Sequence, residues 1–141
     1  TAPGEFIVAP GIFSSSSKMA AHGRELFIKQ ACVSCHGVDG AGDDPAPLYD
    51  DPGQAVFPRD LRYDDFKGGN EAGAIYTRIV AGMPGSPHPP HLDLSDVELR
   101  ALVAYCQSLH KEPRQRLTNY QRAVQASRRR PLHFFAESEN E

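Results

Sequence analysis

The residues with the clearest chemical meaning are Cys32-Val33-Ser34-Cys35-His36. The two cysteines stand three positions apart, and a histidine follows the second directly. One helical turn with this spacing lets both sulfurs bond to the vinyl-derived carbons of one porphyrin and places the histidine under the iron. The motif uses two of the three cysteines in the chain. We therefore predict one covalent haem c, attached to Cys32 and Cys35 with His36 as the proximal iron ligand.

Three other interpretations of the cysteine pair stay open at this point. A thiol–disulfide motif would be expected beside a βαβ pattern, and the sequence has no alternation of strands and helices. A structural zinc site needs a second ligand pair, for which His88 and His91 are the candidates, at a spacing shorter than that of the usual finger. The third interpretation is a cysteine pair packed in an apolar core. The histidine directly after Cys35 favours haem.

The composition indicates one ordinary domain with an appendage. The chain has 141 residues, of which 40% are hydrophobic and none is Trp. That is a lean core for this length. A buried porphyrin would add apolar surface that the side chains lack. No apolar run approaches the length of a membrane-spanning helix, so we expect no transmembrane segment.

The charge is divided unevenly along the chain. Residues 1–109 hold 8 Lys/Arg and 14 Asp/Glu, a net of −6, whereas residues 110–141 hold 7 and 4, a net of +3. The acidic body argues against nucleic acid as a partner. Its aspartates between positions 39 and 51 are typical of a solvated loop, and they could also steer a basic redox partner.

Two segments before the last third of the chain have a helical pattern. Apolar residues recur on one face of residues 18–30, which lead directly into the cysteine motif. Asn70 is expected to cap a second, shorter helix that ends at Gly82. Residues 37–69, between them, form a long loop that is tolerable only if it wraps a bound group. The loop residues expected to touch that group are Leu48, Val56, Phe57, Leu61, Tyr63 and Phe66, and the carbonyl of Pro45 or Pro47 would hold the His36 ring.

The final third has the strongest local signal. Ser95 and Glu98 form a capping box, and Leu94 and Leu99 are placed as a hydrophobic staple, so a helix is expected from there to Leu109. Cys106 lies on its apolar stripe and is interpreted as packing. A further helix is expected over residues 118–128. The other histidines, His22, His110 and His133, are interpreted as solvated side chains.

Several strings together resemble the small monohaem bacterial cytochromes c over about residues 15–109: CVSCHG, GAGDDPAP, PRDLR, RIVAGMPGSP and LSDVELRALVAYCQSL. The resemblance implies an all-α fold of three to five helices around the haem, whose first and last helices cross with Gly23 and Phe27 facing Leu102 and Tyr105. Residues 1–14 would be an N-terminal arm and residues 110–141 a docking tail. The resemblance also implies an extracytoplasmic, periplasmic protein whose signal peptide has been removed.

The resemblance leaves the second iron ligand open between three choices. Related sequences carry a Met between prolines about seven residues before the Ser that caps the last helix. Here His88 stands seven before Ser95, whereas Met83 stands twelve before it. His88 is therefore the expected ligand, with Met83 as the alternative and His91 or an open site as the third. A Met ligand raises the reduction potential, and a second imidazole lowers it.

Two protein ligands on one iron imply electron transfer rather than catalysis, because no coordination position is left for a substrate. We expect a six-coordinate electron carrier, with redox proteins as partners. One alternative is a haem subunit of a larger respiratory or photosynthetic complex, docked through residues 110–141. The other is a haem-based gas sensor whose distal ligand leaves.

Overall fold

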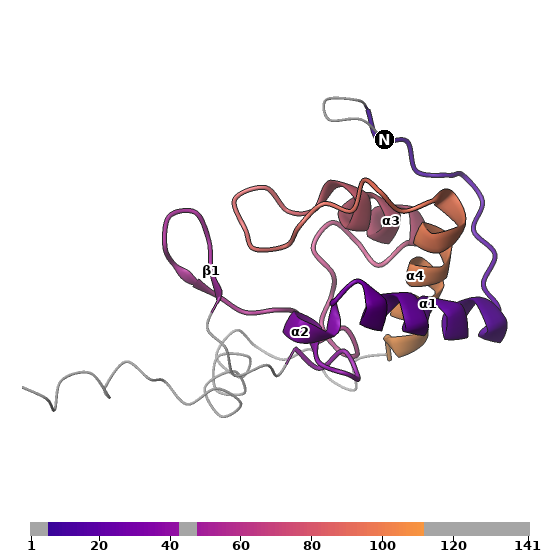
Figure 1. Cartoon of the computed structure of the whole chain (residues 1–141), viewed down its shortest axis with the longest axis horizontal. Coiled ribbons are helices and arrows are strands. Elements are labelled where there is room, and N and C mark those ends of the chain that lie inside the picture. The colour runs from indigo at the N-terminus through magenta and orange to yellow at the C-terminus, as the bar shows by residue number, and fades with distance from the viewer. Residues whose placement is uncertain (1–5, 43–47, 112–141) are drawn as a thin grey trace, which may run out of the picture.

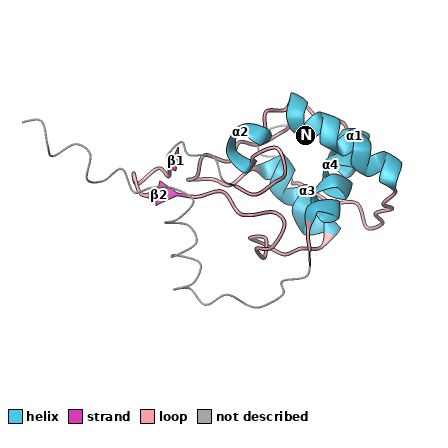
Figure 2. Cartoon of the chain, turned by 90° about the horizontal axis from the view of Figure 1, so that it is seen from below, coloured by secondary structure: helices cyan, strands magenta, loops and turns pink. Residues whose placement is uncertain are grey.

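The computed structural model describes residues 6–42 and 48–111, and the expected helix over residues 118–128 lies outside this part. In chain order the elements are α1 (Ser17–Lys29), α2 (Val33–His36), β1 (Leu48–Tyr49), β2 (Ala55–Val56), α3 (Ala72–Ala81) and α4 (Asp96–Leu109). The expected all-α fold is confirmed, with one small antiparallel hairpin, β1–β2, added in the long loop. Figures 1 and 2 show the hairpin standing apart from the helices.

The Ser16 side chain caps the N-terminus of helix α1. The Ser16 side chain accepts a hydrogen bond from the Met19 amide at 3.1 Å, so the helix starts one residue earlier than predicted. Its buried face consists of Gly23, Leu26 and Phe27. These residues lie against α4, which α1 crosses in Figure 1.

The crossing of α1 and α4 depends on a residue without a side chain. A Cβ added at Gly23 would collide with the Ala101 carbonyl oxygen and with the Tyr105 side chain. Next to this point the Phe27 and Tyr105 rings meet edge to face, with centroids 5.2 Å apart. The predicted contact between the first and last helices is therefore present, and it fixes the direction in which α1 delivers the chain to α2.

Helix α4 is capped as its sequence predicted. The Ser95 hydroxyl accepts from the Glu98 amide, and the Glu98 carboxylate accepts from the Ser95 amide at 2.8 Å. Its middle is buried from Leu99 to Cys106 except for Arg100, because α1 packs on one side and α3 on another. Tyr76 of α3 also donates to Asp96 at 3.0 Å.

The predicted N-cap of α3 is wrong, whereas its predicted end is confirmed. Glu71 precedes the helix and makes no side-chain cap hydrogen bond. Asn70 accepts instead from the Phe66 amide at 2.8 Å, because it closes the turn that brings the loop into the helix. Gly82 ends the helix at φ 66°, a conformation that favours glycine.

The described part of the N-terminal arm lies on the helices. Phe13 meets Tyr76 edge to face at 5.8 Å, and Ile7 and Ala9 pack on the same core. Arg100 donates to the Ile12 carbonyl at 2.6 Å. The division into an arm, a central domain and a tail stays a prediction. Within the described residues, no helix is both long and apolar enough to span a membrane.

The Gly23 contact gives a test of the helix crossing. Gly23→Ala should lower the free energy of unfolding by about 1–3 kcal/mol or more, because the methyl group forces α1 and α4 apart. Helix propensity alone predicts the opposite sign, a gain of about 0.5–1 kcal/mol. Gly11→Ala is the matched control, since an added Cβ there meets nothing within 4 Å. Thermal unfolding of both variants measures the difference, and a Gly23→Ala protein as stable as the control would contradict the crossing.

Candidate haem site

A cavity of about 430 Å³ lies between the cysteine motif, the long loop, α3, α4 and the proline-rich segment 82–91. That volume is within the range of cofactor pockets. The cavity brings together all the residues that the sequence analysis proposed as attachment points or ligands. Cys32, Cys35 and His36 lie on one side, and Met83, His88 and His91 come from the segment 82–91.

The cysteine motif is held in a short helix that begins at a sharp turn. Ala31 has φ 59°, a left-handed conformation that is costly for a residue with a side chain, and it turns the chain out of α1. The Cys32 carbonyl then accepts from the His36 amide at 2.9 Å. Cys32 and Cys35 are both half-buried at the cavity wall. The predicted one-turn spacing of the two sulfurs is thus present.

His36 is fixed by a backbone carbonyl of the long loop. Its Nδ1 lies 3.4 Å from the Arg59 carbonyl oxygen, a long hydrogen bond. Burial lowers the pKa of His36 to about 4, and the hydrogen bond to Arg59 opposes this shift only in part. The ring is therefore neutral at pH 7, as a metal ligand must be. The predicted acceptors, Pro45 and Pro47, lie outside the described residues.

The segment 82–91 is held by backbone hydrogen bonds, both within itself and to α3. The Met83 amide donates to the His88 carbonyl at 3.1 Å, and the His91 amide donates to the Ile79 carbonyl at 3.1 Å. A Cβ at Gly82 would come within 2.7 Å of the His88 carbonyl oxygen, so only glycine permits this approach. These contacts set the position of His88 relative to the end of α3.

The His88 ring faces the His36 ring across the cavity. The two ring centroids are 6.4 Å apart and the ring planes make an angle of 68°. His88 Nδ1 is buried and has no hydrogen-bond partner among the described residues. Burial, reinforced by the charge of His91, lowers the pKa of His88. Two neutral imidazoles therefore meet in one apolar cavity.

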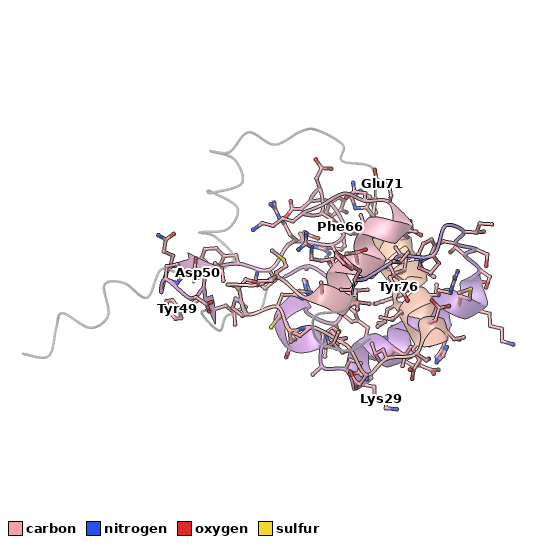
Figure 3. All side chains as sticks on the ribbon, turned by 90° about the horizontal axis from the view of Figure 1, so that it is seen from above. Lys29, Tyr49, Asp50, Phe66, Glu71 and Tyr76 are labelled. Atoms are coloured by element: carbon pink, nitrogen blue, oxygen red, sulfur yellow. The ribbon has the colours of Figure 1, made fainter. Side chains whose placement is uncertain are left out.

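Met83 and His91 also line this cavity, so the structure brings the alternative ligands to the same place. The predicted wall from the long loop is present with one exception. Leu48, Val56, Phe57, Leu61 and Phe66 line the cavity, and Figure 3 labels Phe66. Tyr63 does not, because its ring lies at the surface, 39% exposed, beneath Arg62 and Lys111.

Of the interpretations of the remaining cysteine and histidines, two are confirmed and one is wrong. Cys106 is buried on α4 at 7% exposure, and burial raises the pKa of its thiol to about 12, which fits a packing residue. His22 is exposed as predicted, and His133 lies outside the described residues. The prediction that His110 is solvated is wrong, because its ring packs on Phe66 with centroids 5.2 Å apart.

The other interpretations of the cysteine pair lose their support. In the part of the chain that the structure describes, no three His, Cys, Asp or Glu side chains form a group that could hold a metal ion, as a structural zinc would require. The described strands form one hairpin rather than a βαβ unit. Two residues of the cavity wall, Arg59 and Arg78, were not predicted. Arg59 acts through its backbone carbonyl, for which the sequence has no signal. Arg78 could have been found from its spacing, because it follows Ile75 by three positions on α3 and therefore lies on the same face of that helix.

The comparisons with known proteins agree with this site. The cytochrome c family model matches residues 20–110. The chain belongs to the cytochrome c family. With its CxxCH motif, Cys32 to His36, it carries covalently bound haem c, and both the family and the cofactor predictions are confirmed.

Two relatives share this domain. Cytochrome c oxidase subunit 2 of Alkalihalophilus pseudofirmus is 27% identical over 92 residues, which are 64% of this chain and 26% of that protein. A chain of the reducing HAO-like protein complex of Kuenenia stuttgartiensis is 34% identical with a TM-score of 0.70, over 76% of this chain and 51% of its own length. This cytochrome therefore spans about a quarter of the first relative and about half of the second.

A count of reactive thiols tests the assignment of the three cysteines. We expect no reaction with a thiol reagent at pH 8 in the folded haem protein, because Cys32 and Cys35 are thioethers and Cys106 is buried with a raised pKa. In denaturant one thiol per chain should react, and Cys106→Ala should reduce this to none. Three reactive thiols in the denatured haem-loaded protein would contradict covalent attachment.

Proposed function

We propose that this cytochrome is an electron carrier whose iron is six-coordinate, with His36 and His88 as its axial ligands and with Cys32 and Cys35 as the attachment points. When bound, haem c supplies one-electron redox chemistry. The residues around it hold it, keep water out and set its potential. The observation that carries the proposal is the pair of imidazoles that face each other across the cavity.

The separation of the two rings supports a shared metal. A metal that binds one nitrogen of each of two imidazoles, at about 2.0–2.1 Å and on opposite sides, separates the ring centres by about 6–6.5 Å. The centroids of His36 and His88 are 6.4 Å apart. The observed separation therefore matches that of two imidazoles on one ion.

Local stiffness and protonation state favour His88 further. Pro87 and Pro89 flank it and restrict the backbone, so little conformational entropy remains to be lost when the ring is held. Its pKa is lowered by burial, which keeps the ring neutral and able to coordinate. Met83 lies in the same cavity and remains the alternative ligand.

This arrangement supports outer-sphere electron transfer. With His36 and His88 both bound to the iron, the haem would have no position for a substrate and would exchange electrons through the edge of the porphyrin. We propose redox proteins as partners and an extracytoplasmic location. A second imidazole in place of a thioether implies a potential below that of a His/Met cytochrome.

Substitution of the two candidate ligands tests the proposal. The ferric protein should lack a Met–iron charge-transfer band, and the ferrous protein should not bind carbon monoxide rapidly at neutral pH. His88→Ala should allow stoichiometric carbon monoxide binding, because it opens one axial position. His88→Met should create the charge-transfer band and raise the potential.

Met83→Leu and His91→Ala are the matched controls, since both residues line the same cavity. Both variants should keep the original spectrum. A loss of the six-coordinate spectrum in Met83→Leu but not in His88→Ala would identify a His/Met cytochrome instead. Rapid carbon monoxide binding by the unmodified protein would favour the gas-sensor alternative.

A second candidate function is that of a haem c subunit within a larger redox assembly. The two relatives support it, because both are longer than this chain and one is a chain of a protein complex. Residues 110–141 carry the opposite net charge to residues 1–109 and extend beyond α4, so we propose them as the docking segment.

Native gel electrophoresis of the source cells followed by haem staining tests this second function. A subunit should stain at the size of the assembly, and the band should collapse to the monomer when the assembly is dissolved by detergent or by high salt. A haem band that runs only at the monomer position under mild conditions would argue for a freely diffusing carrier.

A further inference from the structure

Arg78 carries a buried donor that no group in the described protein satisfies. It lies on α3 and lines the same cavity as His88. Its Nε is buried and has no hydrogen-bond partner among residues 6–42 and 48–111. A guanidinium stays charged at every accessible pH, so the burial of one of its N–H groups is costly unless an acceptor is supplied.

The rest of the Arg78 side chain is held in place. Its Nη1 donates to the Gly82 carbonyl at 3.4 Å, directly at the start of the segment that carries His88. Its Nη2 passes close to Gly68, where an added Cβ would lie 2.9 Å from this nitrogen. Gly68 has φ 93°, so the loop has glycine where the guanidinium needs room. The side chain is therefore positioned with one donor still available.

The chemistry of the missing acceptor follows from the charge of the donor. No acidic side chain in the described part of the chain forms an ion pair with Arg78. A planar guanidinium binds a carboxylate through two parallel hydrogen bonds better than it binds any neutral acceptor. The porphyrin of haem c carries two propionate carboxylates. Among the donors that line the cavity, only Arg78 and His88 have a buried nitrogen without a partner.

We propose that Arg78 binds one propionate carboxylate of the haem and ties it, through the Gly82 carbonyl, to the start of the segment that bears His88. Arg78 is thus a positioning residue that couples the cofactor to its distal ligand. It also neutralises the carboxylate inside the cavity. The inference rests on the proposed function in one respect: the cavity must hold the haem. It holds equally whether His88 or Met83 binds the iron.

The reduction potential of the haem-loaded variants as a function of pH tests this assignment. Arg78→Gln leaves a carboxylate buried without its cation, which raises the pKa of that carboxylate, and reduction of the iron raises it further. We therefore expect a potential that falls as the pH rises between 5 and 9 in Arg78→Gln. The unmodified protein should show a much flatter profile in this range, and Arg78→Lys should restore most of the flatness.

Arg24→Gln is the control, because Arg24 is an exposed arginine on α1 that does not line the cavity. Cys32 and Cys35 are thioethers in the haem-loaded protein. The titratable and charged side chains around the cavity other than Arg78 are the same in all variants: His36, Arg59, Lys67, His88, His91 and Cys106. A difference in slope between Arg78→Gln and Arg24→Gln therefore reports the group that Arg78 holds. The ferric spectrum of each variant shows separately whether the axial ligands are unchanged.

If the reduction potential changes with pH at the same slope in Arg78→Gln and Arg24→Gln, the proposal is overturned. The Arg78 Nε would then donate to an internal water instead. If Arg78→Gln yields no haem protein, infrared difference spectra of the unmodified protein on reduction decide. Ionised carboxylate bands without a protonated-carboxyl band between pH 5 and 8 support the pair, and a protonated-carboxyl band in that range rejects it.

Discussion

The structure depends on holding two imidazoles at one separation across an apolar cavity. The His36 and His88 centroids are 6.4 Å apart, and the two rings come from different segments that line that cavity. Each ring is positioned by its own segment of the chain. His36 takes its position from α2, whose direction is set by α1 and by the close crossing at Gly23. His88 takes its position from the end of α3 at Gly82. The helices that pack on α4 are the common frame for both.

The protonation state of the two imidazoles is a second constraint on the same cavity. An imidazole can bind a metal only when it is neutral, and burial lowers the pKa of both rings, that of His36 to about 4. The apolar wall that achieves this would also make a carboxylate or an unpaired guanidinium unfavourable inside it. A cationic residue such as Arg78 at this wall is stabilised when an anion lies beside it. The same low polarity that keeps the two imidazoles neutral therefore favours charges that enter in pairs.

Local signals in the sequence were sufficient to predict the helices and the attachment motif. The capping box at Ser95, the glycine stop at Gly82 and the spacing of Cys32, Cys35 and His36 each act within a few residues, so sequence alone specifies them. The failures involve contacts between distant segments. Asn70 has the right type for an N-cap, but it bonds to the turn at Phe66. Tyr63 has the right character for the cavity wall, but Arg62 and Lys111 hold it at the surface.

The contacts of the long loop, residues 37–69, could not be predicted from its residue types. It contributes to the site partly through backbone groups, which every residue carries: the Arg59 carbonyl holds His36, and the Asp51 amide donates to the Gly85 carbonyl at 2.9 Å. The second bond joins the β1–β2 turn to the segment that carries His88. The loop thus contacts the His36 ring directly and also contacts the segment that carries His88. We therefore expect that a change in the length of this loop disturbs His36 and the segment that carries His88 together. The loop acts on both through its backbone rather than through a particular side chain.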